Sequence, residues 1–397
     1  MFARHLQSHR RSYLLVEAND RVGGRMQTDS HQGFLLDRGF QVYLDSYDQG
    51  LPYLSLPELG LGYFTPGAYV QSKIGRCYFG DPLREPSAFL STLHSPIACP
   101  IDKWRLFLLS QRLKHRSDRE IWSAPEVSTS AYLKSLGFSQ RVLKCFLASF
   151  FGGVFLDDSL GVSSRLFCFL YKRFSLGRAC LPRDGMAAIP RQLANGLDPH
   201  RLLLQQQVAD LDGCEIRTHQ GMVLRGRKVV LAVDQPSATA LMGQARAHSD
   251  RRSTRVYYFS TPEPPELQRP ALLLNGTFQG PIRHLSFPSQ VQSHYAPRGQ
   301  HLVSITTRND DKGQVVELDE QALRSQIWDT FGINSQAWSF LRSYHVPFAL
   351  PILRSMPGPG FTQCRDQVWM VGDHMTYPSI NGAFESANQL ASHLLAK

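Results

Sequence analysis

The sequence lacks the cysteine patterns that organise secreted folds and zinc sites. Its 397 residues include seven cysteines, an odd number, and no two of them stand in a Cys-x-x-Cys pair. Disulfide frameworks need even numbers of cysteines, and structural zinc sites use closely spaced pairs. We therefore predict reduced thiols in an intracellular compartment and no metal site.

A long apolar run is also missing. The longest one, residues 145–156, is about half as long as a membrane-spanning helix. The first six residues carry charge where a signal peptide would have its apolar region. The sequence predicts a protein of the cytoplasm or of an organelle interior, and it leaves loose peripheral association with a membrane open.

Acidic residues are outnumbered by basic ones, which gives a formal net charge of +10. The basic residues are scattered in short clusters, such as Arg10-Arg11 and Arg251-Arg252, rather than gathered in one tract. A scattered excess is typical of a basic surface, so we predict no nucleic-acid partner. The length and a hydrophobic content of 42% suit a globular protein of two domains or of one large composite fold.

A first motif follows a short predicted strand at residues 12–18, where the sequence reads EANDRVGGR. An acid at the end of such a strand, here Glu17, can accept hydrogen bonds from ribose hydroxyls. The adjacent Gly23 and Gly24 let the backbone approach a ligand closely, because no side chain intervenes. Arg25 could bind a diphosphate through charge-assisted hydrogen bonds. The motif therefore predicts a dinucleotide site.

A second motif lies near the other end of the chain. A buried strand is predicted at residues 367–371, and Gly372 and Asp373 follow it. Residues 379–383, Ser-Ile-Asn-Gly-Ala, then begin a helix that runs to the end of the chain. The N-terminus of a helix stabilises negative charge, such as that on a reduced flavin.

Both motifs resemble those of the superfamily of FAD-dependent amine oxidases, protoporphyrinogen oxidases and phytoene desaturases. The resemblance implies that Glu17 holds the adenosine ribose, that Asp373 holds the middle of FAD, and that the second helix start lies under the isoalloxazine. It also implies that main chain near Val208 holds the adenine side. The predicted cofactor-binding residues are Glu17, Gly23, Gly24, Arg25, Gly39, Val208, Gly372, Asp373, Ser379, Ile380, Asn381 and Gly382.

In this superfamily a GxGxxG loop precedes the acid by ~20 residues, and counting back from Glu17 passes the first residue. We therefore expect that a strand belongs between residues 12–18 and 367–371. Either the start is assigned too late or the chain is a damaged or repurposed relative. A form extended by ~25–30 residues is expected to bind FAD better and to be more stable.

The predicted fold is α/β, because two cofactor motifs at opposite ends of the chain must meet at one ligand. A discontinuous Rossmann-like FAD-binding domain is assigned to residues 1–60, 184–234 and 344–397. An α+β substrate domain is assigned to residues 61–183 and 235–343. The first of these two segments contains predicted helices at residues 104–114, 127–136, 139–150 and 163–174.

The leading hypothesis for function is an FAD-dependent oxidoreductase that acts on a small apolar or amine substrate. Aromatic stripes at residues 146–155 and 167–171 could line a tunnel, although such stripes are more often core. The catalytic residues stay unassigned; residues 283–289 contain no lysine, and His284, His294 and Tyr377 are the candidates. A flavin-dependent isomerase without net redox change and a non-enzymatic remnant remain alternatives, and the oligomeric state is not predicted.

Overall fold

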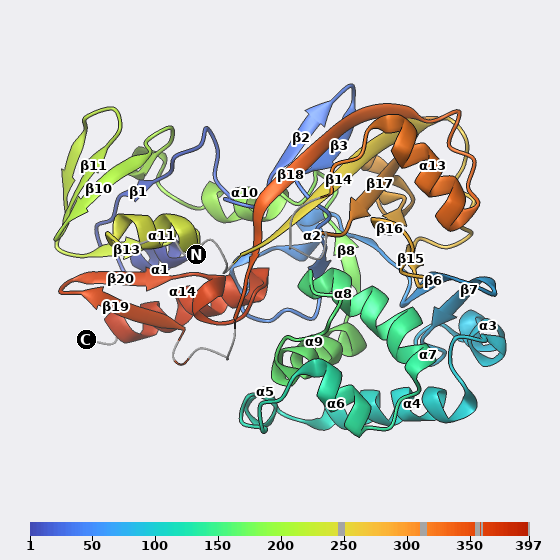
Figure 1. The fold of residues 1–397 in the computed structure, drawn as a ribbon. Coiled ribbons are helices and arrows are strands. Elements are labelled where there is room, and N and C mark those ends of the chain that lie inside the picture. Colours follow the sequence, from blue (N-terminus) through green and yellow to red (C-terminus); the bar gives the residue numbers. More distant parts are fainter. Residues whose placement is uncertain (245–250, 310–315, 354–357, 359, 396–397) are drawn as a thin grey trace.

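The computed structural model describes residues 1–244, 251–309, 316–353, 358 and 360–395. Figure 1 shows two halves. The cofactor half, at the left, combines the two ends of the chain with a segment from its middle. The other half consists of a large sheet, at the upper right, with a group of helices below it.

Two short parallel pairs of strands form the centre of the cofactor half. Strand β1 (Leu15–Val16) pairs with β9 (Leu202–Leu203). Strand β20 (Val368–Val371) pairs with β13 (Val229–Leu231) and, on its other edge, with the antiparallel β19 (Phe361–Arg365). Each pair joins segments that are far apart in sequence, as a discontinuous domain requires.

The two terminal helices close this half from outside. Helices α1 (Phe2–Ser8) and α14 (Ile380–Leu395) lie side by side in Figure 1. His5 Nε2 lies 2.8 Å from Asn388 Oδ1, so a hydrogen bond joins the helices. The beginning and the end of the described chain therefore belong to one packed unit.

The large sheet has seven strands in the order β18-β14-β17-β16-β15-β6-β7, and it is antiparallel except where β15 pairs with β6. Helix α13 (Glu320–Phe331) packs its buried Leu323 and Ile327 against one face of this sheet. The strands are β6 (Gly67–Ser72), β7 (Gly75–Gly80), β14 (Arg251–Thr261), β15 (Leu272–Asn275), β16 (Ile282–Ser286), β17 (His301–Thr307) and β18 (Ser339–Pro351).

The helices below the sheet agree with the helical segment expected within residues 61–183. They surround α9, most of whose side chains are buried because helices pack on several of its faces. Residues 143–148 form a wider π-helical turn between α7 and α8. The helices are α3 (Phe89–His94), α4 (Pro100–His115), α5 (Asp118–Trp122), α6 (Thr129–Ser135), α7 (Gln140–Val142), α8 (Ser149–Phe155) and α9 (Ser164–Leu176).

Smaller elements complete the fold in both halves and between them. A hairpin of β2 and β3 lies against the large sheet, and β8 pairs with both β4 and β5. These elements are β2 (Thr28–His31), β3 (Phe34–Asp37), β4 (Tyr43–Leu44), α2 (Leu56–Leu59), β5 (Gly62–Tyr63), β8 (Ala179–Leu181), α10 (Ala188–Asn195), β10 (Val208–Asp212), β11 (Glu215–Thr218), β12 (Val223–Arg225), α11 (Gln235–Leu241) and α12 (Pro288–Val291).

The predicted α/β fold class is confirmed, but one predicted domain boundary falls inside a continuous strand, and another lies just before a helix whose end packs with the cofactor half. Strand β18 crosses the boundary placed between residues 343 and 344, because it pairs with β14 along its length. Helix α11 follows the boundary at residue 234, yet the adjacent Met242 packs with Leu211 and Leu231 of the cofactor half. Across the described ranges, no helix is both long and apolar enough to cross a bilayer.

Candidate functional site

A cavity of about 1980 Å³ extends from the cofactor half into the helices below the large sheet. At one end it is bounded by β1, β13 and the start of α14, and at the other by side chains of α4, α8 and α9. Ten of the twelve predicted cofactor residues line it: Glu17, Gly23, Gly24, Arg25, Gly39, Val208, Gly372, Asp373, Ser379 and Ile380. The two sequence motifs therefore meet at one cavity.

Glu17 stands directly after β1, where its backbone N–H donates to Leu203 O at 2.8 Å and so extends the parallel pairing with β9. Its carboxylate is oriented from one side, because Oε1 accepts from the backbone N–H and the side-chain amide of Asn19 at 2.8 and 2.7 Å. A carboxylate fixed in this way at a cavity wall suits the binding of neighbouring hydroxyl groups.

Glycine is favoured at positions 23 and 24 for different physical reasons. Gly23 has φ +120°, and a Cβ there would lie 2.7 Å from Met26 O and 2.8 Å from Pro190 Cγ, so the turn against α10 requires glycine. A Cβ on Gly24 would meet no protein atom within 4 Å, although its φ of +56° also favours glycine. Gly24 thus leaves bare backbone at the cavity, as close approach of a ligand requires.

Arg25 and Asp373 join the two motifs directly, across 348 positions of sequence. Arg25 Nη2 donates to Asp373 Oδ1 at 2.5 Å, and Arg25 Nη1 donates to Ala349 O at 2.7 Å. The Asp373 side chain is buried, whereas Arg25 is 33% exposed. Arg25 is therefore held by protein partners, and its role here is to position Asp373; the structure does not reserve it for a diphosphate.

The start of α14 places only part of its motif at the cavity. Ser379 caps the helix, since its Oγ accepts from the N–H of Gly382 at 2.8 Å. Asn381 and Gly382, both predicted to bind the cofactor, do not line the cavity. The Asn381 amide instead bonds to Tyr377 Oη at 2.9 Å and to Gln49 N at 3.1 Å, and a Cβ on Gly382 would lie 2.1 Å from Tyr377 O.

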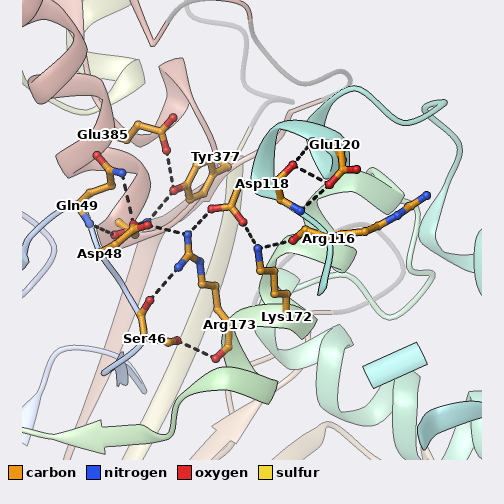
Figure 2. Close-up of polar contacts among 12 residues, drawn as sticks. Ser46, Asp48, Gln49, Arg116, Asp118, Glu120, Lys172, Arg173, Tyr377 and Glu385 are labelled. Atoms are coloured by element: carbon orange, nitrogen blue, oxygen red, sulfur yellow. Dashed lines mark hydrogen bonds and ion pairs between the residues drawn. The ribbon is translucent and has the colours of Figure 1, made fainter. Parts of the chain in front are cut away.

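Behind this helix start lies a buried polar cluster centred on Arg173 of α9 (Figure 2). Arg173 Nη2 donates to Asp48 at 2.9 Å and also to Asp118, while Nη1 donates to Ser46 O at 3.0 Å. Lys172 Nζ binds the second oxygen of Asp118 at 2.7 Å. This cluster, which we call the Arg173 network, ties α9 and α5 to the chain around Asp48 and, through Asn381, to α14.

Tyr377 and His294 are excluded as catalytic residues, because neither of them lines the cavity. Tyr377 packs between Trp122 and Phe169, bonds to Glu385 at 2.8 Å, and does not line the cavity. His294 is exposed and lies 3.1 Å from Gln292 Oε1, also away from the cavity. Both were plausible from sequence because an aromatic or a histidine near a motif does not reveal its direction.

His284 is the candidate that the structure retains. It lies on β16 directly opposite Thr306 of β17, and Thr254 of the next strand, β14, faces the same side. All three line the cavity and are buried, and His284 Nε2, Thr254 Oγ1 and Thr306 Oγ1 have no hydrogen-bond partner within the protein. We call these three side chains the sheet patch. The two threonines were not found from sequence, since nothing in it marks them as neighbours.

The surroundings of His284 keep its imidazole neutral. Burial, together with the nearby Arg283 and Arg308, lowers the pKa of His284 to about 3. Both arginines pair with Asp158, Arg308 through Nη1 at 3.6 Å. The ring also packs edge-on against Phe40, with centroids 4.7 Å apart, next to Gly39 at the cofactor end. A neutral imidazole can accept or donate one hydrogen bond at the cavity wall.

Beyond the sheet patch the cavity wall becomes aromatic. Of the aromatic stripes seen in the sequence, Phe146, Phe150, Phe151 and Tyr171 line the cavity, whereas Phe155, Phe167 and Phe169 are core. Other segments complete this aromatic end with side chains that the sequence did not single out. These are Phe40, Phe64, Phe79, Phe107 and Phe174.

One expectation concerns a strand between β1 and β20. The two strands belong to different sheets, and both line the cavity through Leu15, Val16 and Val371. Among the strands of the described residues, none pairs with both β1 and β20. The additional strand therefore stays a prediction.

The arrangement fits an extended dinucleotide. An acid at a strand end, bare glycine backbone, a buried carboxylate and a helix start line one side of the same cavity. Such groups suit, respectively, a ribose, a closely approaching phosphate, a polyol and a partial negative charge. The sheet patch and the aromatic end then provide a second compartment for a molecule that meets the cofactor.

The chain resembles known proteins over its whole length. A family model described as flavin containing amine oxidoreductase matches residues 1–395. An oxidoreductase from Methanosarcina mazei has a TM-score of 0.71 at 17% identity, with 98% of this chain and 96% of that chain covered. A protoporphyrinogen oxidase candidate from Exiguobacterium sp. 255-15 gives 0.73 at 15% identity, with 100% and 96% covered. Putrescine oxidase bound to putrescine gives 0.71 at 14% identity, with the same shares covered.

At these identities the solved structures show the shared fold. No curated protein sequence matches the chain. The match of the family model covers nearly every residue, including both motifs and the segments that form the aromatic end.

Proposed function

We propose a substrate class for this chain, which belongs to the family of flavin containing amine oxidoreductases. The protein is an FAD-dependent oxidoreductase of the amine oxidase type, and its substrate is a small molecule. The proposal is that this molecule is apolar and uncharged, with at most one polar group at the position that reacts.

The aromatic end of the cavity is the observation that supports this proposal most strongly. Nine aromatic side chains from six separate segments of the chain line it. Burial of apolar surface contributes about 25 cal/mol for each Å² removed from water, so an elongated hydrocarbon gains more from this wall than a short polar molecule. The size of the cavity leaves room for such a molecule beside a dinucleotide.

The charges around the cavity argue against an ammonium substrate. Lys103, Arg84 and Arg178 line it near the aromatic end, and Asp81 is the acid beside them. The carboxylate of Asp158, behind the sheet patch, is already shared by two buried arginines. A cationic amine would therefore meet more positive than negative charge, which costs binding free energy in a poorly solvated site.

Different residues of the chain bind the cofactor and orient the substrate. FAD, when bound, supplies the acceptor for two electrons from the substrate. Glu17 holds the cofactor at the ribose, and Asp373, fixed by Arg25, holds its middle. The sheet patch is placed to orient a polar group where the substrate carries one, since its three side chains line the cavity and each has a polar atom without a protein partner.

The substrate class is tested by anaerobic reduction of the bound flavin. Phytoene dispersed in detergent represents an apolar polyene, and putrescine represents an ammonium substrate. We expect phytoene to bleach the flavin absorbance and putrescine to leave it unchanged over the same time. Rapid bleaching by putrescine and none by phytoene would overturn the proposal, although the chain would still be an amine oxidase by family.

The cofactor residues are tested by flavin retention. Glu17→Ala and Asp373→Ala each remove a charge-assisted hydrogen bond, worth on the order of 1.5–3 kcal/mol, so FAD affinity should fall by about tenfold or more. Asp20→Ala is the matched control, because Asp20 is an exposed acid beside the motif and does not line the cavity. Equal flavin content in all three variants and the wild type would reject both assignments.

A further inference from the structure

Two neighbouring helices, α3 and α4, expose a continuous apolar surface. Helices of water-soluble proteins normally turn apolar side chains inward and polar ones outward. Here the outward side chains are apolar as well, and Trp104 is 59% exposed. We call this surface the apolar patch; its residues are Leu83, Phe89, Leu90, Leu93, Ile101, Trp104, Phe107 and Leu108.

Helix α4 shows the pattern most clearly. Its inner face carries the buried Leu106, Leu109 and Leu113, which pack into the core. Its outer face carries Ile101, Trp104 and Phe107 with Leu108, at the spacing of three or four residues that puts them on one side of a helix. A helix that is apolar on two opposite faces needs a second apolar environment besides the protein core.

The two helices form one rigid surface. Lys103 Nζ, on α4, donates to the backbone oxygens of Leu93 and Ser95 at the end of α3, at 2.6 and 3.1 Å. The rings of Trp104 and Phe107 stack with centroids 5.3 Å apart. Lys103 therefore joins the two helices, and Trp104 and Phe107 support one another on the surface.

The charge around the patch is mainly positive. Residues 81–116 contain six lysines and arginines and three acids, Asp81, Glu85 and Asp102, and Glu85 is paired with Arg269. Asp102 is buried, where its carboxylate accepts from Ser139 and Cys99, so it contributes little to the surface. An apolar centre with a basic surround complements the surface of an anionic bilayer.

The apolar patch is continuous with the cavity. Leu83 and Phe107 are exposed to solvent, and both also line the cavity. Lys103 and Ser110, on the same side of α4, line it too. The aromatic end of the cavity therefore reaches the surface within the patch, so a molecule dissolved in a surface covering the patch would lie directly at the entrance.

We propose that the apolar patch inserts into one leaflet of an anionic bilayer and that the substrate enters the cavity from the bilayer, between Leu83 and Phe107. The docking follows from the surface alone. The route of entry rests on the proposed function, because it requires an apolar substrate that partitions into lipid. The partner is a lipid surface, and α3 with the first turns of α4 is the part that enters it.

Docking is measured by sedimentation of the flavin-loaded protein with vesicles, in the absence of substrate. Vesicles of equal parts phosphatidylcholine and phosphatidylglycerol should bind the protein, those of phosphatidylcholine alone should bind it more weakly, and added salt should reduce the binding. Trp104→Ser should weaken binding by about tenfold, and Leu90→Ser with Trp104→Ser by more, because each removes apolar area from the inserted surface.

Trp328→Ser is the matched control, because Trp328 is 61% exposed on α13, a helix that lies apart from α3 and α4 in Figure 1. It should bind vesicles like the wild type. Equal loss in both tryptophan variants would overturn the proposal, as would absence of binding to either vesicle. Concentration-dependent dimerisation that Trp104→Ser abolishes, without vesicle binding, would identify a second copy as the occupant and would also overturn it.

The route of entry has its own readout. Bleaching of the flavin by phytoene is compared for phytoene in detergent and in the mixed vesicles. The double variant should keep the detergent rate and lose most of the vesicle rate, since neither Leu90 nor Trp104 lines the cavity. Equal vesicle rates in variant and wild type would overturn the route. Failure of phytoene in both media would contradict the substrate class and leave the vesicle sedimentation result standing.

Discussion

The Arg173 network and the sheet patch are both polar clusters around buried side chains, but they differ in how their polar atoms are satisfied. In the Arg173 network both terminal nitrogens of Arg173 bind oxygens, although its Nε has no partner, and the partly exposed acids that they bind have further partners. In the sheet patch, one polar atom on each of three side chains has no partner within the protein. The network does not line the cavity at Arg173, Asp48 or Asp118, whereas every side chain of the sheet patch does.

The difference separates structural polarity from polarity that is available to a ligand. Buried polar groups in folded proteins are almost always hydrogen-bonded, and those that are not call for an explanation. The Arg173 network uses its groups to join α9, α5 and α14. The sheet patch keeps its groups free at the place where a bound molecule can satisfy them. Degree of satisfaction, rather than polarity or burial, therefore distinguishes the two.

The largest expected effect is the loss of Arg173. Arg173→Leu should lower the free energy of unfolding by about 3 kcal/mol, because it leaves Asp48 without a cation and Asp118 with Lys172 alone. Denaturant titration at neutral pH measures the change. Arg225→Leu is the control, because Arg225 pairs with Glu215 at the surface and is 80% exposed, so its loss should matter little. Equal losses of stability in Arg173→Leu and Arg225→Leu would show that the Arg173 network contributes no more to stability than a surface ion pair.

A third buried group, Asp37, sharpens the comparison, because its hydrogen-bond partners are neutral. It accepts from Thr28 Oγ1 at 2.5 Å, Tyr295 Oη at 2.8 Å and Met186 N at 3.0 Å. Burial still outweighs these bonds and raises the pKa of Asp37 to about 6 from 3.8. Hydrogen bonds without an opposite charge thus leave a buried carboxylate only partly stabilised.

The raised pKa gives a defined pH dependence. Between pH 3.8 and about 6 the folded state holds a proton on Asp37 that the unfolded state has lost. The contribution of this group to stability is therefore complete below pH 3.8 and is lost as pH rises to about 6, by on the order of 2–3 kcal/mol. Denaturant midpoints of the wild type and Asp37→Asn across this range should differ in slope. Parallel curves would show that Asp37 is ionised in the folded protein throughout.

The smallest effect on stability is expected in the sheet patch. His284→Leu should leave the free energy of unfolding unchanged or raise it by about 1 kcal/mol, because it removes a buried polar atom without a partner. The same variant should slow flavin reduction about tenfold for an apolar substrate that carries one polar group, such as a long-chain alcohol, since an oriented hydrogen bond is lost. A marked loss of stability, measured by denaturant titration, would place His284 among the structural groups.

His284→Asn serves as the companion variant, because an amide restores a neutral hydrogen-bonding group at this position. It should recover part of the reduction rate without changing the stability gained or kept in His284→Leu. Equal rates in the two variants would show that shape, and not the hydrogen bond, matters at this position.

The sequence was sufficient to predict the parts of the site that depend on local order. Glu17 after a strand, the turn at Gly23 and the strand before Asp373 each follow from a few consecutive residues. Their meeting at one cavity followed from the family resemblance, and the pair Arg25–Asp373 confirms it. The α/β class and several helices were predicted correctly; the apolar periodicity is clear in α9 and α14, whereas α4 is apolar on two faces.

The remaining parts of the site could not be predicted, because they depend on the register of paired strands and on the direction in which side chains point. Pairing of β16 with β17 is irregular between Ile282 and His284, and such an irregularity decides which face His284 occupies. Asn381 lies within the motif, but the packing of α14 turns its amide toward Tyr377 and Asp48. Both outcomes depend on partners that are distant in sequence.

The contact between the two ends of the chain also fixes an order of events during synthesis. His5 is made early and Asn388 is made near the end, so their hydrogen bond, like that of Arg25 with Asp373, cannot form before almost the whole chain exists. The helices between residues 89 and 176 find most of their neighbours locally. They can fold on the ribosome while the cofactor half waits, with its apolar strands unpaired, for the last helix to be released.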